Sequence, residues 1–444
     1  MASPIPFDLR RAFTNIGALL SASVITKIVS AGTTILIARQ VGVAGFGAYA
    51  ATMALLRIAS VLFSLGLDAW LLRNGYRSGE NARLASYTAT NLLIKVGLGA
   101  LWLASISLIS IYLLPALYNP ALLITLAVAI WLEELASTVW STFQAALRNQ
   151  TTFLLTTLFH GLILAVTLIL ISQGEKAILP FAIARTLAAA IGCGIALWWL
   201  RQSLGVPLEP ATWPSEASRQ LRETIPFGLS AGLSLIYGRA DTAITAHWLG
   251  NEAAGLYSSA MSIMSMALLM PLAIYLVMLP ILSRAHAQHS ATLLALTRRL
   301  IGWNTLAGLV LGATLALVAE PLMRLIYGIQ YAQSGLVLTI FSGVLALRFI
   351  SFALAVFVTA VGWQTRRTSV QGIVAVANVG LNLLVVQRWG LPGVATVYLL
   401  TEGILLFGYA RLVIHWWRQE QASWLATANR ETAAEREPPA VSPA

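Results

Sequence analysis

The stretch ARQVGVAGFGAYAATM at residues 38–53 recurs as AHWLGNEAAGLYSSAM at residues 246–261. Both copies fit the pattern A-x-x-[VL]-G-x4-G-x-Y-x3-M, and the second follows the first at a constant offset of 208 residues. Each copy lies between two long apolar segments. A membrane chain built from two similar halves in the same order is typical of a carrier whose substrate site lies between the halves.

The composition places the chain in a lipid bilayer. Hydrophobic residues make up 58% of the 444 residues and charged residues only 10%, whereas a soluble protein carries about 25% charged residues. Because a spanning helix needs about 20 mostly apolar residues, we predict an all-α polytopic membrane protein with about twelve transmembrane helices. The predicted helices cover 14–38, 46–70, 85–113, 119–147, 151–172, 177–200, 224–248, 254–280, 299–319, 335–361, 367–387 and 391–416.

The longest internal connection, at 201–223, separates the sixth predicted helix from the seventh, where a six-plus-six duplication would place its linker. We therefore predict an N-terminal six-helix bundle (1–200), a cytoplasmic linker (201–223) and a C-terminal six-helix bundle (224–417). The polar tail at 418–444 is expected to be disordered. No connection is long enough to form an extramembrane domain.

The positive charges of the connections differ between the two sides of the membrane. With the N-terminus placed in the cytoplasm, fifteen arginines lie on the inner side, against four Lys or Arg residues on the outer side. By the positive-inside rule, both termini are cytoplasmic and the number of helices is even. This distribution accounts for the net charge of +11 without a nucleic-acid partner.

Sequence motifs for cofactor or metal chemistry are missing. The lone cysteine, Cys193, allows no intramolecular disulfide and suggests no thiolate metal site. The five histidines are scattered, and the P-loop, H-E-x-x-H and G-x-S-x-G patterns do not occur. We therefore expect no cofactor, no bound metal and no enzyme activity.

Lys27, Arg57 and Arg348 fall near the middle of predicted helices, and Arg239 lies slightly outside the middle of the seventh. A charge at this depth costs about 2.5–3.5 kcal/mol on insertion scales and usually faces the bundle interior. Ser and Thr residues follow Lys27 and Arg57 at spacings of three and four, which gives each helix one polar stripe. Because such a stripe must face protein or water, we predict a shared hydrated cavity containing these four cations. Arg and Lys suit an anionic substrate such as a phosphate.

The acidic residues at similar depth are Glu133, Glu134 and Asp241. They leave two interpretations open. Glu134 or Asp241 could carry a coupling ion, H+ or Na+. Alternatively, the membrane charges form buried ion pairs, and the Ser and Thr residues assist helix packing. Four further charges lie nearer predicted helix ends, where snorkelling explains long side chains without a function. They are Asp68, Lys95, Arg185 and Glu402.

Further segments accompany the repeat, in order along nearly the whole chain. They are Leu279-Pro280 with Ser283-Arg284, Leu325-Ile326-Tyr327-Gly328 with Tyr331-Ala332, Asn378 with Asn382, and Gly390-Leu391-Pro392-Gly393-Val394-Ala395 with Glu402. Together with the repeat they resemble the polysaccharide-transporter branch of the multidrug/oligosaccharidyl-lipid/polysaccharide (MOP) exporter superfamily, the Wzx-type flippases. The resemblance implies a MATE-like fold of two six-helix bundles related by a pseudo-twofold axis along the membrane normal. It also implies a central cationic cavity and alternating access.

The function implied by the resemblance is translocation of undecaprenyl-pyrophosphate-linked oligosaccharide across the inner (plasma) membrane, for O-antigen, capsule or exopolysaccharide synthesis. Lys27, Arg57 and Arg348 would hold the pyrophosphate or acidic sugars, and Arg239 would do so in the outward-open state. This assignment rests on their positions in this chain and not on a family motif. Expected partners are the lipid-linked oligosaccharide, membrane lipids, the coupling ion and a glycan polymerase, and the protein is expected to be a monomer.

Two alternatives stay open. An ion-coupled multidrug or small-solute antiporter of the same superfamily would favour an acidic cavity. A membrane glycan polymerase or ligase would need an outer catalytic loop, and the outer connections of this chain are short.

Overall fold

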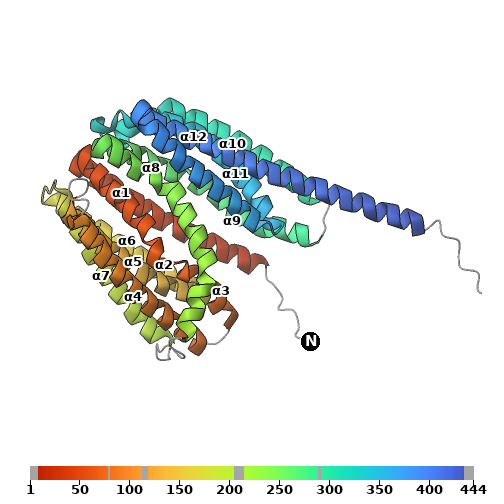
Figure 1. The fold of residues 1–444 in the computed structure, drawn as a ribbon, viewed down its shortest axis with the longest axis horizontal. Coiled ribbons are helices and arrows are strands. Elements are labelled where there is room, and N and C mark those ends of the chain that lie inside the picture. Colours follow the sequence, from red (N-terminus) through yellow and green to blue (C-terminus); the bar gives the residue numbers. More distant parts are fainter. Residues whose placement is uncertain (1–8, 79–80, 113–118, 205–214, 289–291, 435–444) are drawn as a thin grey trace, which may run out of the picture.

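The computed structural model describes the chain except residues 1–8, 79–80, 113–118, 205–214, 289–291 and 435–444 (Figure 1). Throughout this part the secondary structure is helical, which confirms the predicted all-α class. The elements are α1 (Leu9–Ala59), α2 (Val61–Ser64), α3 (Leu67–Ser78), α4 (Asn81–Tyr112), α5 (Pro120–Ala145), α6 (Asn149–Ser172), α7 (Ile178–Leu204), α8 (Ser215–Ala267), α9 (Leu269–Ala287), α10 (Thr292–Tyr327), the short 3-10 helix η1 (Ile329–Tyr331), α11 (Ser334–Ala360) and α12 (Gln364–Ala434).

Helices α1, α8 and α12 each consist of two limbs that meet at one glycine. Gly42, Gly250 and Gly390 have φ values of 75°, 85° and 58°, which glycine adopts without the steric cost of a Cβ. Nine helical segments of the described chain are long and apolar enough to cross a membrane, and the three that contain these glycines run for 40, 57 and 56 residues. Because one crossing needs about 20 residues, each of the three accounts for two crossings. The structure therefore supports the predicted number of about twelve.

The sequence repeat builds a symmetric contact between the two halves. A Cβ placed on Gly47 would lie 1.6 Å from the carbonyl oxygen of Asn251, and one on Gly255 would lie 2.1 Å from the carbonyl oxygen of Val43. Adding the offset of 208 residues converts one pair into the other. The same surface is therefore used twice around a local twofold axis, as in an isologous interface. Any larger side chain would hold these backbones apart.

Figure 1 shows how the two halves are arranged. They meet at the end of the molecule where α1 and α8 turn at their glycines, and they diverge toward the end where α1 begins and α12 ends. We call the meeting end, built around the repeat segments 38–53 and 246–261, the closed end. Its core joins both halves, since Phe46 contacts Tyr331 at a ring-centroid distance of 6.4 Å. The Tyr331 hydroxyl donates a hydrogen bond of 2.9 Å to the carbonyl oxygen of Ala38.

One contact between the halves persists at the opposite end. Helix α2 ends at Leu65, whose φ of 45° is left-handed, and Gly66 follows with a φ of 74°. A Cβ on Gly66 would lie 2.5 Å from the backbone nitrogen of Gly228. Nearby, the indole nitrogen of Trp70 donates to Glu223 at 2.7 Å. The first limb of α8 therefore lies against α3 of the first half.

The C-terminal helix is longer than the sequence suggested. Helix α12 continues to Ala434, whereas we expected disorder from residue 418 onward. Residues 418–434 contain several alanines and no glycine or proline, a composition that favours helix. Residues 435–444 of the expected tail and 205–214 of the expected linker lie outside the described residues, and the predicted domain boundaries stay predictions.

Candidate substrate cavity

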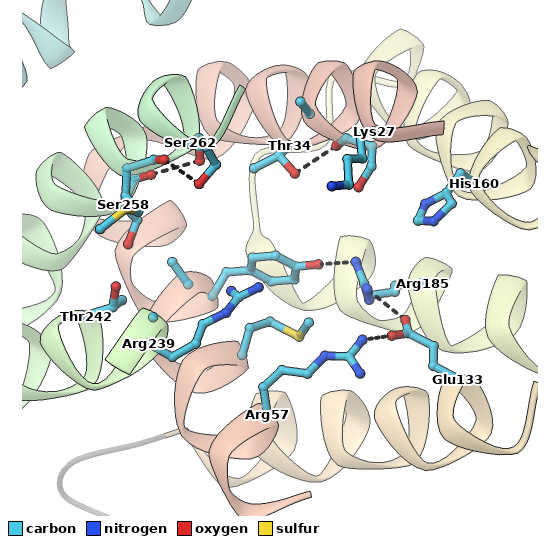
Figure 2. A pocket seen from close by; sticks show the side chains of 18 of the residues that line it. Lys27, Thr34, Arg57, Glu133, His160, Arg185, Arg239, Thr242, Ser258 and Ser262 are labelled. Atoms are coloured by element: carbon cyan, nitrogen blue, oxygen red, sulfur yellow. Dashed lines mark hydrogen bonds and ion pairs between the residues drawn. The ribbon is translucent and has the colours of Figure 1, made fainter. Parts of the chain in front are cut away.

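A cavity of about 660 Å³ lies between the two halves, and we call it the main cavity (Figure 2). Its walls come from α1, α5, α6 and α7 on one side and from α8 and α9 on the other. The charged residues that line it are Lys27, Arg57, Arg185, Arg239, Glu133 and Glu134. Four cations against two carboxylates leave a formal excess of two positive charges. The volume falls within the range of about 300–1,000 Å³ that is usual for small-ligand sites.

Glu133 of α5 holds two of the cations. Its carboxylate accepts a hydrogen bond from Arg57 of α1 and forms an ion pair with Arg185 of α7, whose Nη2 lies 2.7 Å from Oε1. Arg57 also lies 3.3 Å from Glu134, and Arg185 donates to the Tyr49 hydroxyl at 3.2 Å. Since Glu133 is only 5% exposed, these three helices share a buried charge cluster. The charges of Arg57 and Arg185 are therefore compensated in this conformation.

Lys27 and Arg239 are placed differently. Both side chains are exposed to the main cavity, and Figure 2 shows them extending into it from α1 and α8. Neither forms an ion pair with any residue that the structure describes. Their charges are therefore free to attract an anion that enters the cavity.

A buried lysine lies behind this charge cluster. Lys95 of α4 is fully buried, and its Nζ lies 2.8 Å from both carboxylate oxygens of Asp68 and 2.9 Å from the carbonyl oxygen of Glu134. Thr138 donates a further hydrogen bond of 2.9 Å to Asp68. The snorkelling interpretation is therefore wrong for Lys95, which joins α3, α4 and α5 in the interior.

Arg348 of α11 does not line the main cavity. Its Nε lies 2.8 Å from Oε2 of the fully buried Glu402, and its Nη2 donates to the Tyr398 hydroxyl at 3.0 Å. Tyr237 donates to the same carboxylate at 3.0 Å. The guanidinium instead lines a smaller cavity of about 270 Å³ in the second half, which we call the side cavity. The structure therefore brings three of the four predicted cations together and places the fourth apart.

Asp241 lines neither cavity and is buried inside the second half. Tyr257 donates to its Oδ2 at 2.8 Å, and the Asn382 amide donates to its Oδ1 at 2.9 Å. Tyr257 is the repeat equivalent of Tyr49. Both copies of the repeat therefore place a tyrosine hydroxyl on a charged side chain, which is Arg185 in the first half and Asp241 in the second.

Sequence reasoning missed some residues of the main cavity. Arg185 was attributed to snorkelling, although it lies two turns inside α7. Tyr49 carried a signal, because it is conserved between the two copies of the repeat. His160 also lines the cavity, and no pattern in the sequence marked it. Within the described residues, no group of three or more His, Cys, Asp or Glu side chains is arranged to hold a metal ion.

The arrangement of the helices matches that of solved transporters. The chain superimposes on the inward-facing conformation of a multidrug resistance MATE family transporter of the MOP superfamily, with a TM-score of 0.72 and 14% identity, over 90% of this chain and 96% of that one. The outward-facing conformation of such a transporter gives a TM-score of 0.61 at 15% identity, over 89% and 95%. A third match is a MOP superfamily transporter from Pyrococcus furiosus, described by a reverse polarity of its binding pocket that suggests a different function (TM-score 0.61, 14% identity, 91% and 95% coverage). The fold is therefore that of a MOP-superfamily transporter.

The sequence places the chain more narrowly within that class. Residues 12–286, more than half of the chain, match the model of the family described as polysaccharide biosynthesis protein. The chain belongs to this family, it has the fold of MOP-superfamily transporters, and its long apolar helices make it a multi-pass membrane protein. Its fold matches those of solved transporters. None of the curated protein sequences compared with it matches.

Proposed function

We propose that the protein is a flippase that moves undecaprenyl-pyrophosphate-linked oligosaccharide from the inner to the outer leaflet during surface polysaccharide synthesis. The observation that carries the proposal is the main cavity, with its two excess positive charges and with Lys27 and Arg239 unpaired among the described residues. Arg binds phosphate oxygens in a bidentate manner and Lys binds them as a point charge. Membership of the polysaccharide biosynthesis family supports the glycan part of the substrate.

The proposed orientation places both termini in the cytoplasm of a bacterial cell, in agreement with the excess of arginines in the inner connections. The closed end then faces the periplasm, and the conformation is inward-facing. The TM-score of 0.72 with the inward-facing MATE transporter, against 0.61 with the outward-facing one, supports this assignment. The pyrophosphate would enter the main cavity from the inner leaflet, and separation of the contacts around Gly47 and Gly255 would release it on the other side.

Ion coupling is proposed at Asp241 or Glu134. Asp241 is buried and accepts hydrogen bonds from the Tyr257 hydroxyl and the Asn382 amide. The same Asn382 amide also donates to Asn378. A buried carboxylate at membrane depth is a strong candidate to take up H+ or Na+. Glu134 lines the main cavity and forms an ion pair with Arg57. A proton bound to the Glu134 carboxylate would neutralise it and weaken this ion pair.

The runner-up function is an ion-coupled multidrug or small-solute antiporter. A carrier of cationic drugs favours an acidic cavity, whereas the main cavity has a positive excess. The Pyrococcus furiosus neighbour, whose description links reversed pocket polarity to a different function, supports the same reasoning. A glycan polymerase or ligase is disfavoured because the described connections at the closed end, such as 173–177 and 328–333, hold at most six residues.

Depletion of the protein in cells tests the proposal. Lipid-linked oligosaccharide is measured in each leaflet, and surface glycan is quantified alongside. We expect the lipid-linked oligosaccharide to accumulate in the inner leaflet while surface glycan is lost, and the mass of the accumulated lipid would identify the glycan. Unchanged lipid-linked sugars after depletion would overturn the flippase proposal and favour export of a small solute.

Charge-neutral variants test the role of the cavity. Lys27→Gln and Arg239→Gln should each lower flipping by about tenfold or more, since one charge-assisted hydrogen bond commonly contributes that much to binding. Arg388→Gln is the matched control, because Arg388 is exposed and lies outside both cavities. Flipping at the parental rate in both cavity variants, at equal protein levels, would contradict the proposed anion site.

A further inference from the structure

His160 lies at the middle of α6 and lines the main cavity. It is the twelfth of the 24 residues of this helix and the only one whose side chain ionises. Its side chain is half-buried, and Figure 2 shows it among the charged side chains of the cavity. Because an ionisable residue at this membrane depth is costly to keep, one that faces a cavity is a candidate for a role in transport.

The neighbours of the imidazole ring hold it without using its nitrogen atoms. The buried Phe159 packs edge-on against His160, with ring centroids 5.3 Å apart and an interplanar angle of 88°. Phe159 packs in turn against Trp140, at a centroid distance of 5.6 Å. Among the residues that the structure describes, neither ring nitrogen of His160 has a hydrogen bond or an ion pair. Both nitrogens are therefore available to a molecule in the main cavity.

The carboxylates of the main cavity are already paired with cations. Glu133 pairs with Arg57 and Arg185. Glu134 lies 3.3 Å from Arg57 and 3.5 Å from the Nζ of Lys95. Imidazole is the side chain whose charge ordinarily changes between about pH 5 and pH 8. His160 is therefore the group on the cavity wall that can change its charge near neutral pH without breaking an ion pair.

The charges around His160 decide when its ring carries a proton. The charged groups that line the cavity from the helices packed against α6 are Lys27 and Arg57 of α1, Glu133 and Glu134 of α5, and Arg185 of α7. Arg239 of α8 adds a cation from the other half. While the ring is neutral, the cavity has an excess of two positive charges, and this excess disfavours a third. An anion in the cavity would offset the excess and favour the imidazolium, which has a donor on each nitrogen.

We propose that His160 is a further anion-binding residue of the main cavity, and that its ring takes up a proton from water when the pyrophosphate of the lipid-linked oligosaccharide binds. The inference rests on the proposed flippase function and adds a binding residue to it. The proton bonds to the free ring nitrogen, and the imidazolium then donates a hydrogen bond to a phosphate oxygen. Because protonation and anion binding favour each other by the same factor, the affinity is highest at low pH and falls as the pH rises. Unlike the coupling ion proposed at Asp241 or Glu134, this proton is bound together with the substrate.

The pH dependence of binding tests this inference on the full-length protein in nanodiscs. The probe is undecaprenyl pyrophosphate esterified with one N-acetylglucosamine, because this diester has no group that titrates near neutral pH. We expect the probe to bind about tenfold more tightly at about pH 6 than at about pH 8. Calorimetry at about pH 7 in two buffers of different ionisation enthalpy should show net uptake of protons on binding.

Three variants separate the charge of His160 from its packing. His160→Gln keeps a neutral hydrogen-bonding side chain, so it should lose the pH dependence and bind the probe within about twofold of the parent at about pH 8. His160→Lys carries its charge throughout this range, and at about pH 8 it should bind the probe as tightly as the parent does at about pH 6. His247→Gln is the matched control, since His247 is exposed and lines neither cavity. It should keep the parental pH dependence.

Two results would overturn the role of His160 while the flippase proposal stands. One is a parent protein that binds the probe with the same affinity at both pH values. The other is a pH dependence that His160→Gln retains, which would assign it to another group. If the parent protein does not bind the probe at any pH, the flippase proposal fails and this inference fails with it.

Discussion

The symmetric glycine contact at the closed end predicts that adding one methyl group will open that end. Real Cβ atoms essentially never approach a neighbouring atom closer than 3.0 Å, and a Cβ on Gly47 would lie 1.6 Å from the carbonyl oxygen of Asn251. In Gly47→Ala the two backbones must therefore separate by roughly 1.4 Å. In Gly255→Ala the Cβ would lie 2.1 Å from the carbonyl oxygen of Val43, and the separation needed is roughly 0.9 Å.

Overpacking of this kind costs about 1–3 kcal/mol, and each 1.4 kcal/mol is a factor of ten in an equilibrium constant. The cost applies only to the conformation in which the two halves meet at the closed end. We therefore expect the population of that conformation to fall by about 5- to 150-fold relative to the conformation in which the halves are separated there. Gly47→Ala should have the larger effect of the two. Gly32→Ala is the matched control, since it makes the same change on the first limb of α1, where no atom lies within 4 Å.

Cysteine accessibility measures this shift. The native Cys193 is replaced by serine, and Ser258→Cys places a thiol in the main cavity, three residues beyond Gly255. A membrane-impermeant maleimide is added outside intact cells, on the side that the closed end faces in the proposed orientation. We expect faster labelling in the Gly47→Ala background than with Gly32→Ala. Labelling rates that agree within about twofold in all backgrounds, for protein of equal thermal stability, would refute the reasoning.

Three further substitutions test the charge clusters and the glycine turns. Lys95→Met should lower the free energy of unfolding by about 3–5 kcal/mol because it leaves the Asp68 carboxylate without its cation. The double variant with Asp68→Leu should recover most of this loss. If thermal unfolding shows that the losses of the two single variants add up in the double variant, the pairing is contradicted. Glu133→Gln should leave Arg57 and Arg185 without the carboxylate that now pairs with both. We therefore expect lower thermal stability but tighter pyrophosphate binding. An unchanged affinity for pyrophosphate would argue that Glu133 and pyrophosphate do not compete for these two arginines. Gly250→Ala should cost about 1–3 kcal/mol, because a φ of 85° strains any residue with a Cβ, whereas Gly302→Ala should not destabilise; equal melting temperatures of the two variants would show that the turn is not strained.

The candidate site could be predicted from the sequence only in part. Depth in the membrane singled out Lys27, Arg57 and Arg239, and all three line the main cavity. Depth alone could not separate Arg348, because its carboxylate partner lies 54 residues further along the chain and on another helix. Lys95 shows the opposite error. Its place near a predicted helix end suggested that it extends to the membrane surface, but it is fully buried and paired with the Asp68 carboxylate.

The sequence by itself determined the membrane class, the number of crossings and the duplication. In a bilayer every backbone polar group must be satisfied inside a helix or a closed barrel, so that long apolar stretches leave few choices of structure. The repeated glycines likewise specify the turns at Gly42 and Gly250, since the positive φ is a local property of the backbone. These features depend on residues close together in the chain, which is why they can be read along it.

Only the tertiary structure decided which charges are compensated and which are free. Glu133 collects Arg57 and Arg185 from two other helices, while Lys27 and Arg239 receive no such partner among the described residues. Whether an intramembrane charge is neutralised depends on carboxylates that approach to within about 4 Å from distant parts of the chain. That proximity is set by the rotation and crossing of helices, because hydropathy fixes how long a helix is but not the direction in which each side chain points.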